Sequence, residues 1–473
     1  MCYYVKNSLL MQKLFTIPLV CAIATMSVTA QDDANYLRTP LPKDWAADGE
    51  FFEQKMPADD LWWRNFEDAT LDSLINIAVT RNFQVLGAIE NIKRAKAQWR
   101  QAQGNLYPTV DLSGGWQRAK SSGNTAQTLY RESWDGYFSG GVSASWQMDV
   151  FGSIYMRAKA QKRLFQATEE EYRAVMTALC ASVATNWFSL RESLARLEVL
   201  RSNVESQKEI MNIVTARYNS GLASKLDVAQ SRSVYYNTRA QIPAMQATID
   251  GYRNTLATLL GCYPQQLTGL TAATTLPSYI EPLALGVPGN LLRRRPDIRK
   301  AEREIESYAA ALGASKRDWL PAFYLTGSIG YAADKPKELP HSRSLTWEIA
   351  PTIKWNIFNG GKSANATREA RAALEQSIIS FNGSVLTAMQ EVETAMSNYK
   401  NSITEIVSIK EAVNQSSETL TLSLELYKQG LAQFQSVLDA QRTLLNYQDR
   451  LVQAQGASLI YLVQLYEALG GGW

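Results

Sequence analysis

Residues 345–355 read Leu-Thr-Trp-Glu-Ile-Ala-Pro-Thr-Ile-Lys-Trp, and large apolar side chains occupy almost every second position. The positions between them carry the polar or charged residues Thr346, Glu348, Thr352 and Lys354. A period of two places alternate side chains on opposite faces of a β-strand. The stretch therefore predicts a strand with one apolar face and one polar face.

Three other segments alternate in the same way, within residues 109–116, 138–148 and 322–331. Aromatic residues near the strand ends and polar residues on the alternate positions are typical of an outer-membrane barrel with a watery interior. We expect the following side chains to face lipid: Trp116, Phe138, Trp146, Phe323, Leu325, Trp347 and Trp355. The alternative is a pair of soluble hairpins, which would need another core for these residues.

Four strands are too few to close a membrane barrel, because the smallest barrels have about eight. Two copies of the chain would supply about eight strands, and side chains would fill the interior of so narrow a barrel. Three copies would supply about twelve. We therefore expect a homotrimer with a twelve-stranded barrel.

Two segments predict very long helices. Residues 153–220 contain neither Gly nor Pro, and residues 362–429 contain only Gly383. The second segment has apolar residues at heptad spacing, as in a coiled coil. At 1.5 Å per residue each helix would be roughly 95–100 Å long. Shorter helices are expected beside them, at residues 71–103, 227–260, 298–317 and 437–465.

The chain repeats its landmarks with a period of about 210 residues. Asp149-Val150-Phe151-Gly152 corresponds to Asn356-Ile357-Phe358-Asn359-Gly360-Gly361, and Tyr218 with its downstream glycine corresponds to Tyr427. The duplication predicts a first repeat at residues 31–270, a linker at 271–296 and a second repeat at 297–473. Each repeat would hold long coiled-coil helices and two barrel strands, so the fold class is mainly α with a membrane β-barrel.

A Gly-Leu-Ala run ends each long helix, as Gly221-Leu222-Ala223 in the first repeat and Gly430-Leu431-Ala432 in the second. A glycine suits the left-handed position after a helix. Asp227 and Ser436 would then suit the N-cap of a returning helix. Each repeat is therefore expected to end in the tip of a helical hairpin.

The N-terminus has the pattern of a secretory signal peptide, predicted at residues 1–30. Lys6 and Lys13 precede an apolar run, and Val28-Thr29-Ala30 fits a small-x-small cleavage site. Translation could also start at Met11. Lipidation of Cys21 is the alternative to simple cleavage.

The composition argues against most enzymatic and nucleic-acid functions. Lys and Arg number 48 against 45 Asp and Glu, which gives no electrostatic reason to bind nucleic acid. The single histidine, His341, cannot complete a Ser/His/Asp or Cys/His set, and no ligand cluster for a metal stands near it. We expect no enzyme activity and no cofactor. The Arg293-Arg294-Arg295 run is interpreted as a solvated or internally paired surface.

Several motifs together resemble the outer membrane factor family, in particular its TolC/NodT-type efflux branch. They are Trp62-Trp63-x-x-Phe66-x-Asp68, Asp149-Val150-Phe151-Gly152, Leu292-Arg293-Arg294-Arg295-Pro296-Asp297-Ile298, Val437-Leu438-Asp439-Ala440-Gln441 and the terminal Gly470-Gly471-Gly472-Trp473. The resemblance implies an outer-membrane trimer with a periplasmic α-helical tunnel. It implies an exit duct for efflux that docks to a periplasmic adaptor and to an inner-membrane pump of the resistance-nodulation-division type. The alternatives are a type I secretion duct for polypeptides and a periplasmic coiled-coil structural protein without a pore.

The resemblance also implies roles for residues at the tips. Asp439, Asp227 and Tyr427 match the positions of a periplasmic gate. The Gly-Leu-Ala runs are expected to dock the adaptor, because the small Ala223 and Ala432 would leave room for the helical tip of a partner. Relatives of the TolC type carry a basic residue two positions after the tip glycine, where this chain has Ala432. A salt-bridge lock at that position is therefore not expected.

Overall fold

A computed structural model describes residues 36–38, 40–42, 45, 52–53, 61–118, 136–267, 270, 275–277, 283–284 and 294–471. The chain divides into Met1–Thr39 and Pro40–Trp473, and the helices and the sheets of the described residues belong to the second unit. The predicted signal peptide at 1–30 lies outside the described residues, as do most of the linker at 271–296 and residues 119–135.

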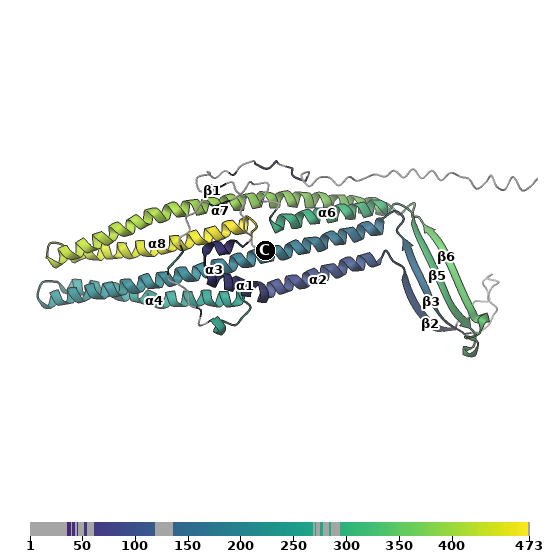
Figure 1. Ribbon diagram of the computed structural model, residues 1–473, viewed down its shortest axis with the longest axis horizontal. Helices are drawn as coiled ribbons and strands as arrows, with labels where there is room; N and C mark the ends of the chain where they lie inside the picture. Colours follow the sequence, from purple (N-terminus) through teal and green to yellow (C-terminus); the bar gives the residue numbers. More distant parts are fainter. Residues whose placement is uncertain are drawn as a thin grey trace, which may run out of the picture. The chain divides into compact units, whose positions relative to one another are not determined.

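The four expected strands form one antiparallel sheet. They are β2 (Thr109–Arg118), β3 (Gly136–Met148), β5 (Ala322–Ala333) and β6 (Leu345–Lys354), in the spatial order β2-β3-β5-β6. Each repeat thus contributes one hairpin, and β3 pairs with β5 to join the two (Figure 1). The outer strands β2 and β6 each have one long edge without a neighbour among the described residues.

The register places the apolar side chains on a single face of this sheet. Directly paired residues of antiparallel strands lie on the same face. The pairs Trp116↔Phe138, Trp146↔Leu325 and Ile329↔Trp347 therefore share one face. The other face is mostly polar, with pairs such as Ser143↔Ser328 and Ser328↔Glu348. The alternation predicted from the sequence is confirmed in all four strands.

Two tryptophans tie the strands to the chain entering the sheet. Trp146 Nε1 donates a hydrogen bond to the carbonyl of Leu106 at 2.9 Å, and Trp355 Nε1 donates to that of Trp319 at 3.1 Å. Each acceptor lies two residues before a proline that precedes a strand, Pro108 or Pro321. The same contact therefore occurs once in each repeat, at the end of the sheet that joins the helices.

The long helices are α3 (Ser153–Asn219) and α7 (Lys362–Lys428), each 67 residues. At 1.5 Å per residue each is about 100 Å long, as expected. The returning helices are α4 (Lys225–Leu259), which packs on the tip-proximal part of α3, and α8 (Phe434–Ala468), which packs on that of α7. Helix α6 (Pro296–Arg317) packs between α3 and α7 nearer the sheet (Figure 1).

One expected helix is broken in two. Residues 71–103 were expected to form a single helix, but the structure has α1 (Ala69–Arg81) and α2 (Phe83–Gly104). Asn82 between them has ψ of 130°, and its side-chain oxygen accepts hydrogen bonds from the backbone of Gln84 and Val85. Its Nδ2 donates to the carbonyl of Leu259 at 2.8 Å. This contact with α4 stabilises an N-cap at a position where the helix could have continued.

The remaining elements are short. Strands β1 (Phe52–Glu53) and β4 (Leu283–Ala284) pair in parallel. Single 3-10 turns occur at Trp62–Phe66, Pro264–Leu267, Pro336–Glu338 and Ser342–Ser344.

The main apolar core lies midway along the helices. Trp62 stacks on Tyr466 with ring centroids 5.2 Å apart, and Trp187 Nε1 donates to the Asp68 carboxylate at 2.8 Å. Arg191 makes an ion pair with the same carboxylate at 2.7 Å. Arg295 is buried and donates to the carbonyl of Ala468 at 2.7 Å. The Trp62–Asp68 motif and Arg295 thus hold the C-terminal part of α8.

Helices α3 and α8 approach closely at Gly456. A β-carbon at this position would lie 2.6 Å from Glu192 Cγ and 2.7 Å from its Oε2. Burial raises the pKa of the Glu192 carboxyl to about 6, although Arg196 opposes the rise. The missing side chain of Gly456 therefore allows a half-buried carboxyl to lie between the two helices.

We expect Gly456→Ala to lower the free energy of unfolding by about 1–3 kcal/mol, because overpacking forces the helices apart. Gly383→Ala is the matched control, since Gly383 also lies inside a helix but has no atom within 4 Å of an added β-carbon. There the substitution should stabilise the protein by about 1 kcal/mol through helix propensity. Thermal unfolding followed by circular dichroism in detergent measures both. Equal effects of the two substitutions would contradict the close approach.

The paired hairpin tips

The two hairpin turns have the same backbone geometry. Gly221 and Gly430 have φ of 76° and 78°, in the left-handed region that favours glycine. The backbone nitrogen of Gly221 donates to the Tyr218 carbonyl, and that of Leu222 donates to the Arg217 carbonyl. Gly430 and Leu431 repeat this pattern with Tyr427 and Leu426. These paired bonds form a Schellman motif, so the glycine position predicted from the sequence is confirmed in both repeats.

The returning helices begin differently from the expectation. Ser224 is the N-cap of α4, and Asp227 is the third helical residue, so the expected N-cap at Asp227 is wrong. The Asp227 nitrogen donates to Ser224 Oγ and its carboxylate accepts from the Ser224 nitrogen, each at 3.1 Å. This is a capping box. Ser436 is not the N-cap of α8, because α8 begins at Phe434 with Gln433 before it.

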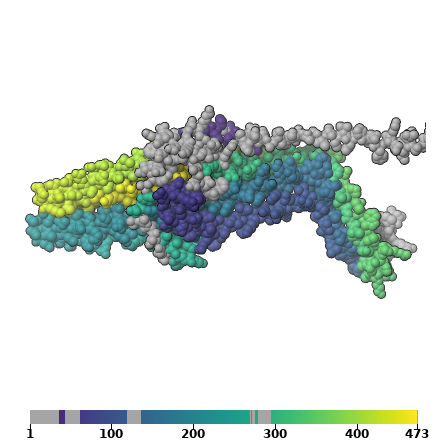
Figure 2. All heavy atoms as spheres, viewed as in Figure 1, coloured from purple at the N-terminus to yellow at the C-terminus, as the bar shows by residue number. Residues whose placement is uncertain are grey.

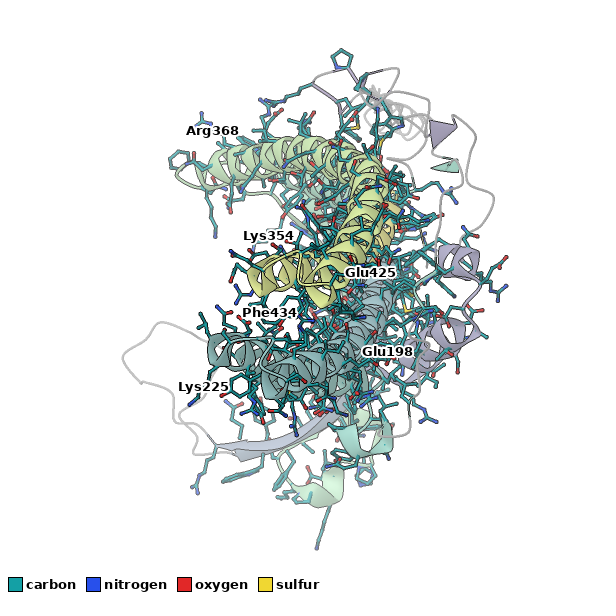
Figure 3. The ribbon with its side chains drawn as sticks, turned by 90° about the vertical axis from the view of Figure 1, so that its left-hand side faces the viewer. Glu198, Lys225, Lys354, Arg368, Glu425 and Phe434 are labelled. Carbon is teal, nitrogen blue, oxygen red and sulfur yellow. The ribbon has the colours of Figure 1, made fainter. Side chains whose placement is uncertain are left out.

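A small apolar core holds the two hairpins together near the tips. It contains Ile210, Val214, Val228, Val234, Tyr427, Phe434, Val437 and Leu438, contributed by both hairpins. Figure 2 shows the teal and yellow-green hairpins in contact. Figure 3 looks onto the tips, with Lys225 at the start of α4 and Phe434 at the start of α8.

A groove of about 580 Å³ lies between the two turns. Arg217 crosses from one hairpin to the other: its Nη1 donates to the Lys428 carbonyl at 2.6 Å, and its guanidinium carbon lies 5.0 Å from the centroid of the Tyr427 ring. Phe434 packs on the other side, with its ring 5.2 Å from that of Tyr427. Asp227 also lines the groove. Cationic, aromatic and acidic groups thus meet where α3 and α7 end.

The electrostatics of the groove centre on Tyr427. Burial raises the pKa of its phenol, and the nearby Asp227 carboxylate raises it further, whereas Arg217 lowers it. The phenol therefore stays neutral around physiological pH. The opposite charges of Arg217 and Asp227 thus both act on a neutral, buried phenol.

The structure brings together two of the three residues assigned to the gate. Asp227 and Tyr427 line the same groove. Asp439 lies on α8 outside that groove, exposed, and accepts a hydrogen bond from Gln435 Nε2 at 2.9 Å. Its side chain lies away from the core formed by Val437 and Leu438.

Sequence reasoning missed Arg217. A signal for this residue was present in a comparison of the two repeats, because Tyr218 and Tyr427 occupy corresponding positions, each three residues before a tip glycine. Tyr427 is 5% exposed and Tyr218 is 42% exposed, so only one of the equivalent tyrosines enters the core. The residue before each tyrosine differs correspondingly: Arg217 in the first repeat and Leu426 in the second.

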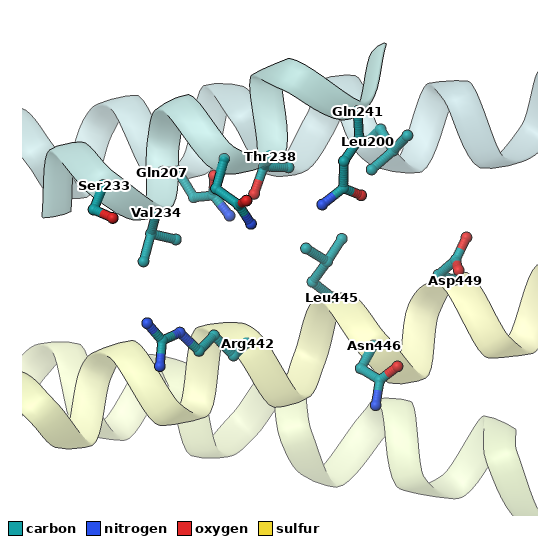
Figure 4. Close-up of a pocket in the computed structure, with 11 residues that line it drawn as sticks. Leu200, Gln207, Ser233, Val234, Thr238, Gln241, Arg442, Leu445, Asn446 and Asp449 are labelled. Carbon is teal, nitrogen blue, oxygen red and sulfur yellow. The ribbon is translucent and has the colours of Figure 1, made fainter. Parts of the chain in front are cut away.

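A second cavity of about 300 Å³ lies farther from the tips, between α3, α4 and α8 (Figure 4). Its lining is mostly polar and includes Gln207, Thr238, Arg442 and Asp449. Asp449 is held by Arg196 through two hydrogen bonds of 2.7 and 3.1 Å. We find no helix in the described part of the chain that is long and apolar enough to cross a membrane.

The chain matches known proteins over most of its length. A sequence model of the family described as outer membrane efflux protein matches residues 74–262 and 287–471. The toluene efflux pump outer membrane protein TtgI of Pseudomonas putida is 30% identical over 416 residues, which cover 86% of each chain. The cation efflux system protein CusC of Escherichia coli is 29% identical over 415 residues, covering 87% of this chain and 88% of that protein.

Among solved structures, the outer-membrane channel OprN superimposes with a TM-score of 0.86 at 28% identity, covering 92% of this chain and 98% of that one. The one-sided sheet, the 67-residue helices and the paired tips therefore define a channel protein with a trimeric barrel and a helical tunnel. The chain belongs to the outer membrane efflux protein family. It is located in the outer membrane and serves as the exit duct of a tripartite efflux system, with an adaptor and an inner-membrane pump as partners.

We expect Arg217→Met to loosen the second hairpin turn, because the variant loses the bond to the Lys428 carbonyl and the contact with the Tyr427 ring. A hydrogen bond from a charged donor contributes roughly 1.5–3 kcal/mol, so the Gly430 and Leu431 amides should exchange hydrogen roughly ten- to a hundredfold faster. Lys208→Met is the control, since Lys208 on the same helix pairs with Glu205 one turn away. Unchanged exchange in Arg217→Met would mean that the guanidinium does not hold the turn.

Proposed function

We propose that the paired tips form the periplasmic gate of this duct, that they dock the adaptor, and that the pump is a resistance-nodulation-division transporter. The observation that carries the proposal is the groove shared by the two turns, where Arg217, Tyr427 and Asp227 meet. Family members are channel proteins, and a groove where the two hairpins meet suits the closing of a passage.

The contacts between the hairpins support a gate that opens by movement of one hairpin against the other. The core at the tips is small, and one guanidinium makes the polar contact between the two helix ends. A small core with few bonds separates at lower cost than the main core around Trp187. Three copies around an axis would bring three such tips together.

Asp439 would act in a different way from the residues of the groove. On a threefold axis its exposed carboxylate would occur three times at close range. At separations on the order of 7 Å each pair would repel by about 0.6 kcal/mol in water and by about 2.4 kcal/mol at an effective dielectric of 20. Such a ring would attract cations to the closed tip.

The docking surface would be the exposed part of the turns. Leu222 and Leu431 are 65% and 72% exposed, and Gly221 and Gly430 leave open space beside them. The small Ala223 and Ala432 leave room for the helical tip of a partner. An exposed leucine between two small residues suits an apolar contact with an adaptor.

The apolar face of the sheet would contact outer-membrane lipid through Trp116, Phe138, Trp146, Phe323, Leu325, Trp347 and Trp355. The polar face would line the water-filled interior. The two repeats would comprise residues 31–270 and 297–473, with the linker 271–296 between them and a cleaved signal peptide at 1–30.

We expect Gly430→Leu to abolish efflux while trimers still form, because the added side chain would block the partner's tip. Gly360→Leu is a control for backbone strain, since Gly360 also has positive φ, 62° against 78°, with open space around it. Drug susceptibility of cells and trimer bands in outer-membrane fractions measure the two effects. If the Gly430→Leu variant exports normally, the tips are not the docking surface.

Asp439→Asn should reduce the cation selectivity of single channels in planar bilayers at least twofold and weaken block by trivalent cations. The amide keeps a hydrogen-bond acceptor for Gln435, so the local structure is preserved. Glu418→Gln removes the same charge from an exposed site on α7 and should change neither property. Unchanged cation selectivity in the Asp439→Asn variant would mean that Asp439 does not line the pore.

A further inference from the structure

The turns that connect the sheet to the long helices each expose a pair of large apolar side chains. Before α3 these are Val150 and Phe151, which are 60% and 40% exposed. Before α7 they are Ile357 and Phe358, which are 82% and 87% exposed. Ile357 and Phe358 are among the most exposed large apolar residues described in the chain, and the two pairs occupy corresponding positions in the two repeats.

The pairs continue the apolar face of the sheet. Strand β6 ends at Lys354, but the alternation of its apolar side extends through Trp355 to Ile357. The ring of Phe151 lies 6.1 Å from that of Phe323, which belongs to the same face. Trp319 and Tyr107, which precede the strands at this end, are also exposed. The apolar surface thus extends beyond the hydrogen-bonded strands.

The length of the strands indicates the depth at which these turns would lie. Strand β6 has 10 residues. At about 3.3 Å per residue and a tilt of roughly 40°, it spans about 25 Å, the usual height of the apolar band of an outer-membrane barrel. Residues just beyond the end of β6 that leads to α7 would therefore lie at the level of the lipid headgroups.

The backbone of the turns is suited to such a position. The Asp149 carboxylate accepts hydrogen bonds from the backbone nitrogens of Ile154 and Tyr155, at 3.0 and 2.6 Å. These amides at the start of α3 would otherwise need water. Gly152 and Gly361, with φ of 77° and 84°, begin the helices immediately after each turn.

We propose that these two turns are membrane anchors, which insert Val150–Phe151 and Ile357–Phe358 into the interfacial region of the phospholipid leaflet that faces the periplasm. This inference rests on the proposed lipid contact of the sheet. The repetition favours lipid over a protein partner. The two turns lie on different hairpins of each chain and continue the same apolar face of the sheet, and a bilayer surrounds every hairpin of a closed barrel.

The test measures depth with a fluorophore attached to single cysteines in trimers reconstituted into phosphatidylethanolamine–phosphatidylglycerol vesicles. Cys180 is retained, because burial raises the pKa of its thiol to about 12 and it will not label at neutral pH. The other native cysteines are replaced by Ala. The probes are Phe358→Cys at the turn, Ile349→Cys in mid-strand and Leu431→Cys at the tip, all at exposed apolar positions.

A label at position 358 should be quenched at least twofold more strongly by headgroup nitroxide lipids than by chain-end nitroxide lipids. A label at 349 should show the reverse preference, and a label at 431 should be quenched by neither lipid. If 349 behaves as expected but 358 is quenched by neither lipid, the anchor is wrong and the lipid-facing sheet stands. If lipid quenchers do not reach 349 either, both proposals are wrong.

Discussion

In the described part of the chain the outer edges of the sheet, on β2 and β6, have no partner strand, and this is the constraint on which the rest of the assembly depends. Within a bilayer each backbone N–H or C=O without a partner costs several kcal/mol, so an open sheet cannot remain in lipid. The edges must pair with those of other copies, and the family forms trimers. Closure of the barrel then places three pairs of 67-residue helices around one axis and gathers the hairpin tips at its far end.

The duplication is preserved where the structure meets the membrane and altered where the hairpins meet each other. Both repeats have the tryptophan contact to the carbonyl two residues before the proline, and both have the same glycine turn. At the tips, Tyr218 is exposed whereas Tyr427 is buried. Of the two returning helices, α4 has a capping box and α8 does not. The two hairpins thus differ where they contact each other. The first hairpin donates a hydrogen bond through Arg217, and the second accepts it at the Lys428 carbonyl.

Features that depend on a few neighbouring residues could be predicted from the sequence. The period of two identified all four strands, and the Gly-Leu-Ala runs located both turns, because a glycine with positive φ is a local requirement. The break at Asn82 could not be predicted, since its amide is held by the distant Leu259 carbonyl. The expected helix starts at Asp227 and Ser436 were wrong because Ser224 and Gln433 compete for the same role within a few residues.

The sequence by itself determined which side chains share the apolar face of the sheet, where the chain reverses, and that one chain supplies too few strands to close a barrel. These follow from periodicity and backbone conformation, which are local properties. The tertiary structure alone decided that Arg217 reaches the Lys428 carbonyl, that Tyr427 and Asp227 share a groove and that Asp439 does not line it. Those contacts join residues about 200 positions apart, and their geometry is set by how the two hairpins pack.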